Sequence, residues 1–261
     1  MSFTGKSPSE TYKDIIQIDN SNSGVDSTSR ILKTGEGSTT ALSLSDRSLQ
    51  VKSNTNNTTA LDVQNTSGTS RLIVDTTNDT VKSLGTHVNT QYANFSVDGG
   101  TQAASFADDT HQAIPLASSY SDKSNPPAFG TGTDPATTFT TAEGNATRAS
   151  DLVPVMWIVP DNISIDSVTS LEGADAATGD TTRMHLFSYT FASGSTSALT
   201  GGTLLAHNSD ITNAGSEQAY KSTWTVDSAS VDATKVILAF FRSDSINSDY
   251  AVNIIVKYHL T

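Results

Sequence analysis

The hydrophobic pattern of the chain changes near residue 150. Before that point, apolar residues occur as isolated pairs two positions apart, and polar turn residues separate one pair from the next. Because side chains two positions apart share one face of a strand, each pair predicts a short strand with a two-residue apolar face. The pairs are Leu42 with Leu44, Leu49 with Val51, Leu61 with Val63, and Leu72 with Val74.

Strands this short bury too little apolar surface to form a core within one chain, because ordering the many Ser, Thr and Asn residues around them costs conformational entropy. Three outcomes are open: disorder, docking on a larger partner, or a core shared by identical chains. Low hydrophobicity with net charge is typical of disorder, but a disordered segment has no reason to keep a regular alternation. The pattern therefore favours a slender shaft of intertwined short strands over residues 41–117.

After residue 150 the alternation is sustained. Residues 220–226 and 252–260 have one apolar and one polar face, whereas residues 236–241 (VILAFF) are apolar throughout, which predicts a central strand covered on both faces. Further strands are expected within 153–159, 163–171, 183–191 and 202–207. Seven strands predict a jelly-roll-like β-sandwich over residues 151–261. The Pro- and Gly-rich residues 118–150 are expected to connect it to the shaft.

Helical spacing occurs only near the N-terminus. Tyr12, Ile15 and Ile16 follow a Ser9 that would cap a short helix over residues 10–18. This helix falls within residues 1–40, which precede the shaft, and the rest of the chain is expected to be all-β.

Composition strengthens the β assignment and excludes several classes of function. Ser and Thr together supply 75 of the 261 residues, and β-branched Thr suits a half-solvated sheet surface. The net charge of −12 opposes binding to nucleic acid or anionic membranes. The longest apolar run has six residues, far below the roughly 20 that span a bilayer. The N-terminus shows no secretory signal, so synthesis in a cytoplasm is expected.

The sequence offers no specific catalytic or metal-binding motif. The chain has no Cys, which excludes disulfides and thiolate sites. Its five histidines, scattered along the chain, lack metal-ligand spacing, although three copies of one axial His would converge in a trimer. Carboxylate pairs such as Asp108 with Asp109, or Glu172 with Asp175, are too common to indicate glycoside cleavage. We therefore expect no enzymatic activity, no cofactor and no metal.

Recognition through exposed loops is a better candidate for function than catalysis. Residues 193–202, 208–217 and 243–249 are rich in Ser, Gly and Asn, which suit adaptable polar contacts with a receptor. Trp157 and Trp224 lie in apolar strands and are expected in the core. The candidate receptor contacts are Ser193, Ser195, Asn208, Asp210, Asn213, Asn247 and Tyr250.

Several segments resemble a known family. Residues 5–8 (GKSP), 11–24 (TYKDIIQIDNSNSG), 35–37 (GEG) and 41–44 (ALSL) resemble the N-terminal region of fibre-type virion proteins of marine tailed phages. Residues 65–81 (NTSGTSRLIVDTTNDTV) are similar to a module of phage tail fibres and spikes. The C-terminal region looks like the trimeric jelly rolls of the tumour-necrosis-factor type that cap such fibres. The resemblance covers about the first 85 residues.

The resemblance implies a homotrimer located in the virion and assembled in the host cytoplasm. Its N-terminal segment, with Tyr12, Ile15, Ile16 and Ile18, would attach to another virion protein of the capsid, portal or tail. Its C-terminal sandwich would bind a host-surface glycan, with no nucleic-acid partner and no membrane insertion. The alternative is a decoration or adaptor protein of capsid or tail with a purely structural role.

Overall fold

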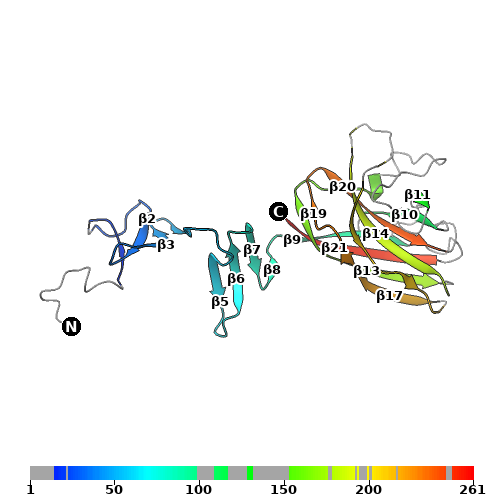
Figure 1. Cartoon of the computed structure of the whole chain (residues 1–261), viewed down its shortest axis with the longest axis horizontal. Helices are drawn as coiled ribbons and strands as arrows, with labels where there is room; N and C mark the ends of the chain where they lie inside the picture. The colour runs from blue at the N-terminus through cyan, green and yellow to red at the C-terminus, as the bar shows by residue number, and fades with distance from the viewer. Residues whose placement is uncertain are drawn as a thin grey trace. The chain divides into compact units, whose positions relative to one another are not determined.

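The computed structural model is all-β, with antiparallel pairing throughout, and divides into two compact units, residues 1–88 and 89–261 (Figure 1). The structure describes residues 15–21, 23–98, 109–116, 128–131, 153–175, 178–191, 193, 199, 202–215, 217–244 and 249–261. In these ranges the one helical element is a 3-10 turn, Val153–Val155. No helix in the described ranges has the length and apolar character needed to cross a membrane.

The N-terminal unit contains two four-stranded sheets in which strands adjacent in sequence pair with one another. The first sheet consists of β1 (Ile16–Ile18), β2 (Arg30–Thr34), β3 (Thr39–Leu44) and β4 (Leu49–Val51). The second consists of β5 (Leu61–Gln64), β6 (Ser70–Asp75), β7 (Thr80–Ser83) and β8 (Thr86–His87). Each of the four predicted apolar pairs lies in a strand, in β3, β4, β5 and β6, which confirms this part of the pattern.

The apolar pairs of the N-terminal unit meet across the ladders but stay uncovered in the single chain. Leu42 lies opposite Val51, and Val63 lies opposite Leu72. Among the described residues up to residue 88 no apolar side chain is buried, and the exposed fraction reaches 66% at Leu49 and 47% at Val63. These sheets therefore have apolar faces without a core of their own.

The expected helix over residues 10–18 is wrong at its C-terminal end. Ile16–Ile18 form β1, which pairs with β2 from Leu32 to Thr34. A segment this short gains little from helical spacing alone, and ladder hydrogen bonds to β2 satisfy its backbone instead. Residues 10–14 lie outside the described residues.

The C-terminal unit is a sandwich of two sheets, which confirms the sustained alternation after residue 150. The five-stranded sheet contains β9 (Thr90–Asp98), β13 (Ile163–Asp175), β17 (Gln218–Thr223), β19 (Ser230–Val231) and β21 (Asp249–Leu260). The eight-stranded sheet contains β10 (Thr110–Ile114), β11 (Ala128–Thr131), β12 (Trp157–Ile158), β14 (Thr181–Thr190), β15 (Thr203–His207), β16 (Ile211–Thr212), β18 (Thr225–Val226) and β20 (Lys235–Ser243). The main strands follow the orders β17-β13-β21-β9 and β10-β20-β14-β15.

The sandwich begins well before residue 151, the boundary expected from the sequence. β9 pairs along its length with β21, and β10 pairs with β20, so residues assigned to the shaft belong to the sandwich (Figure 1). β11 falls within the expected connector over residues 118–150 and pairs with β10. The difference arises because pairing between the first and last strands of the sandwich is a long-range contact that local periodicity does not reveal.

Two apolar clusters hold the sandwich together. The first lies between the sheets and joins Ile254 of β21 with Met184 of β14 and Phe241 of β20. The second lies on the other face of the eight-stranded sheet and includes Phe187 and Phe240. Residues 236–241 of β20 contribute to both clusters, which confirms the predicted central strand. Trp157 and Trp224 lie in the first cluster, as expected of core residues.

Replacing Ile254 with Asp is expected to destabilise the sandwich by about 4 kcal/mol, because the side chain is fully buried among apolar neighbours. Urea unfolding followed by tryptophan fluorescence measures this unit alone, since both Trp residues of the chain lie in it. Ile158→Asp, the same substitution at a residue of β12 that is 64% exposed, is the control and should shift the midpoint little. Equal midpoints for the two variants would contradict the inward orientation of Ile254.

Candidate functional site

Three of the candidate receptor contacts are buried in the sandwich. The Asn208 side chain accepts a hydrogen bond from the backbone N–H of Met184 at 2.6 Å, and only 1% of Asn208 is exposed. Asn213 is equally buried and bonds the backbone of Asp180. The Tyr250 hydroxyl contacts the Ser243 hydroxyl at 3.2 Å. These side chains hold the ends of strands together, which removes them from the set of contact residues.

The other candidates divide into two groups. Ser193 and Asp210 are exposed, and Asp210 forms an ion pair with Arg183 of β14. Ser195 and Asn247 lie outside the described residues. Asp210 is therefore an exposed candidate residue that is also tied to a charged side chain of the eight-stranded sheet.

The expected anchoring residues are partly visible. Ile15 and Ile16 are 46% and 61% exposed, and Ile18 is half-buried. Ile16 and Ile18 belong to β1, an edge strand of its sheet. Tyr12 lies outside the described residues. An exposed apolar edge strand has unpaired backbone groups and apolar side chains available to another chain.

Three histidines that are far apart in the sequence lie side by side on the outward face of the eight-stranded sheet. The rings of His111 in β10 and His185 in β14 are 5.5 Å apart, and the rings of His185 and His207 in β15 are 6.4 Å apart. His111 and His185 are buried, whereas the half-exposed His207 bonds Asp227 through Nδ1 at 2.8 Å. Burial, followed by the charges of neighbouring groups, lowers the pKa of His185 to about 2 and keeps this ring neutral.

Two arginines extend this group toward the end of the sheet. Arg183 of β14 lies directly opposite Arg242 of β20 in the ladder. Arg183 forms an ion pair with Asp210, and Arg242 forms one with Asp109. We call the set of His111, His185, His207, Arg183 and Arg242 the Arg–His row.

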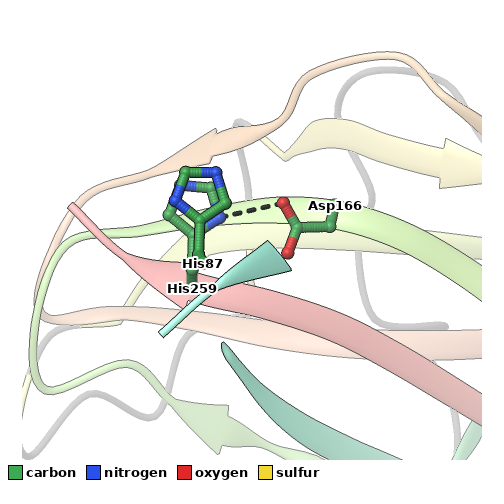
Figure 2. Close-up of side chains that lie close together, drawn as sticks. All are labelled: His87, Asp166 and His259. Carbon is green, nitrogen blue, oxygen red and sulfur yellow. Dashed lines mark hydrogen bonds and ion pairs between the residues drawn. The ribbon is translucent and has the colours of Figure 1, made fainter. Parts of the chain in front are cut away.

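The Arg–His row has the wrong geometry for a metal centre. A zinc ion needs ligand atoms about 2.0–2.1 Å from one common point, whereas these three rings follow one another across the sheet. His259 of β21 bonds Asp166 at 2.9 Å through Nδ1 on the five-stranded sheet (Figure 2).

Glu172 of β13 is a buried carboxyl between the two sheets. Only 1% of the residue is exposed, and the Thr182 hydroxyl lies 2.9 Å from both carboxyl oxygens. Burial raises the pKa of Glu172 from its ordinary 4.5 to about 7, and the hydrogen bond from Thr182 offsets only part of this rise. This carboxyl is thus enclosed between the two sheets rather than exposed on the surface of the sandwich.

A hollow of about 540 Å³ lies on the five-stranded sheet, along one row of its four main strands. Small residues at its floor, Gly173, Ala219 and Ala251, lie side by side in register. A β-carbon added at Gly173 would meet no atom within 4 Å. Packing in the single chain therefore does not require this glycine, and a glycine inside a strand often marks close approach by a ligand or another backbone.

Comparison with known proteins identifies no relative: no family model matches the chain, and no curated protein matches it. The fold defines the chain only as an all-β protein with a two-sheet sandwich.

The Arg–His row was missed by the sequence analysis. Its only local signal is the period-two spacing of Arg183, His185 and Phe187, which puts them on one face of a strand. The other members come from strands far away in the sequence. The pairing of β14 with β15 and β20, and of β20 with β10, brings them together.

Glu172→Gln is expected to remove a pH dependence of stability. Because folding raises the pKa of Glu172, the folded wild type binds an extra proton between pH 4.5 and about 7, and stability falls as pH rises through this range. The loss is at most roughly 3 kcal/mol. Above pH 7 the Gln variant should therefore unfold at higher urea than the wild type, and near pH 4.5 the two should agree.

Tryptophan fluorescence at pH 4.5, 6 and 8 measures this difference. Glu217→Gln, which changes an exposed residue, is the control for the loss of one negative charge. Parallel pH profiles for the wild type and Glu172→Gln would show that the carboxyl does not titrate in the core.

Proposed function

We propose that the chain is a non-enzymatic, homotrimeric fibre protein of a phage virion. Its N-terminal segment attaches to another virion protein, and its C-terminal sandwich binds host-surface glycans without a cofactor. The observation that carries the proposal is the absence of any buried apolar side chain among the described residues 15–21 and 23–88. Strands with regular apolar pairs and no core of their own need other chains to cover them.

The N-terminal unit supports the shared core in detail. Leu61 and Val63 face Val74 and Leu72 across β5 and β6, so four apolar side chains gather on one side of this sheet. Leu61 is 38% exposed and Val63 is 47% exposed. If three copies packed together through these apolar faces, the side chains on them would be shielded from water.

The strand order supports a jelly-roll form for the sandwich. If β9, β10, β13, β14, β15, β17, β20 and β21 are numbered one to eight, the two sheets have the orders 6-3-8-1 and 2-7-4-5. This is the order of two interlocked Greek keys, by which a jelly roll is defined. Jelly rolls serve many functions, so the order supports the architecture of the proposal and not its receptor.

The outward face of the five-stranded sheet supports contact between copies of the sandwich. Tyr92 of β9 is 61% exposed and Leu171 of β13 is 53% exposed on this face, where the hollow above Gly173 also lies. The eight-stranded sheet, by contrast, has an apolar cluster on each face. In the proposed trimer, the sandwich of a second copy covers this face.

The exposed edge strand β1 supports attachment at the N-terminal end. Ile15 and Ile16 offer apolar contacts, and the free edge of β1 offers backbone hydrogen bonds to a strand of another virion protein. Glycan binding at the distal end requires only weak single sites, because three copies multiply a weak affinity through avidity.

A purely structural decoration or adaptor protein is the second candidate function. It is favoured by the burial of Asn208, Asn213 and Tyr250, which leaves fewer polar side chains for a receptor than the sequence suggested. Under this alternative the sandwich has no ligand.

The proposal predicts a solution mass of three times 27.4 kDa, and Val63→Asp should dissociate the trimer. In a monomer this substitution of an exposed residue would change stability by no more than about 0.5 kcal/mol, whereas in a shared core it buries a charge. Lys82→Gln, on the opposite face of the same sheet, makes the same change in net charge and should leave the trimer intact. Sedimentation analysis measures all three masses, and a wild-type monomer would refute the shared core.

Glycan binding is tested with the purified full-length protein on an immobilised glycan array. Binding is expected for the wild type, and a dissociated Val63→Asp variant should bind at least about tenfold more weakly because avidity is lost. Failure to bind any glycan or host cells would favour the purely structural alternative.

A further inference from the structure

Like charges lie directly opposite each other near the ends of two neighbouring strands of the eight-stranded sheet, β14 and β20. Arg183 and Arg242 are ladder partners on β14 and β20, and their side chains lie on the same outward face. Like charges in directly opposed positions destabilise an antiparallel pair. Asp210 and Asp109 each contact one of them from the edge of the group, and both aspartates are about half-exposed. The fold thus keeps two guanidinium groups together at a cost in stability.

The interior of the Arg–His row contains polar atoms without partners. The Nε atom of Arg242 and the Nδ1 atom of His185 are buried and make no hydrogen bond to any described residue. The Arg242 side chain is only 12% exposed, and its contact with Asp109 uses Nη2. A buried donor without an acceptor destabilises the folded state, and an acceptor bound there would remove this cost.

The concentration of arginine and histidine residues at this point is also unusual for the chain. The net charge is −12, yet two of the three arginines after residue 89 and three of the four histidines there belong to the row. Arg183 of the row pairs with Asp210, which lies in the 208–217 loop that the sequence predicted for receptor contact. A guanidinium group binds an oxyanion through two parallel N–H bonds to two of its oxygen atoms, a geometry that lysine does not offer.

We propose that the Arg–His row is an anion-binding site, and that its ligand is a carboxylate or sulfate group of an acidic saccharide. The inference rests on the proposed function, since it names the class of glycan that the sandwich binds. Arg183 and Arg242 clasp the anion, and Asp109 and Asp210 hold the two guanidinium groups in position from the sides. His185 stays neutral in its buried position, so it can donate one N–H bond without adding charge.

The test measures binding of the full-length protein to three immobilised polymers: dextran sulfate, which carries sulfate alone, polygalacturonate, which carries carboxylate alone, and dextran, which is neutral. We expect binding to at least one acidic polymer, no binding to dextran, and weakening as NaCl increases. Arg183→Gln and Arg242→Gln should each reduce the affinity at least about tenfold. Arg242→Lys, which keeps the positive charge but lacks the parallel N–H groups of a guanidinium, should recover only part of the lost affinity.

Lys235→Gln is the matched control, because it removes one positive charge from the opposite end of β20, where Lys235 bonds Thr190. Its affinity should equal that of the wild type. Tryptophan fluorescence verifies that each variant keeps a folded sandwich. Where Arg242→Gln fails this criterion, Arg183→Gln decides, because the Arg183 side chain is twice as exposed, at 24% against 12%.

The failure of this inference is distinct from the failure of the proposed function. Binding of the wild type to a glycan, acidic or neutral, that persists unchanged in both Arg→Gln variants would overturn the anion site and leave the proposed function intact. Absence of binding to every glycan would overturn both. Sulfate binding and carboxylate binding both support the site, and the preferred polymer identifies the anion.

Discussion

The sandwich depends on the burial of β20 on both of its faces. Ile237, Ala239 and Phe241 pack toward the five-stranded sheet, while Val236, Leu238 and Phe240 pack into the second cluster on the far side. The ladder itself is secured by β14 on one edge and by β10 and β12 on the other. Each neighbouring element is thus positioned relative to one strand, including the segments of β10 and β14 that carry the Arg–His row.

Apolar side chains of the N-terminal unit also need a second layer to bury them, but the described residues of this unit supply none. There every ladder forms between neighbours in the sequence, so apolar residues such as Leu49 and Val63 have no second layer among the described residues. Hydrophobic residues make up 35% of the whole chain, and those buried among the described residues all lie in the C-terminal unit. The C-terminal unit covers its apolar side chains within the chain, whereas the described part of the N-terminal unit does not.

Local periodicity predicted the features that depend on neighbouring residues. The alternation in β3 to β6, β17 and β21, and the uninterrupted apolar run of β20, all correspond to observed strands because a side chain's face follows from its position in the strand. The start of the sandwich could not be predicted in this way, since β9 acquires its place from β21 at the other end of the unit. Burial of Asn208 and Tyr250 likewise depends on strands packed around them, as does the Arg–His row, whose three histidines come from β10, β14 and β15.

The pairing of β9 with β21 affects the order in which the two units can fold during translation. Translation delivers the hairpins of the N-terminal sheets first, and their contacts are short-range, so they are able to form while the ribosome is still at work. The sandwich forms later, because its first strand pairs with Asp249–Leu260, which lies more than 150 residues further along the chain. The hairpins of the N-terminal sheets are thus able to form before the sandwich can close.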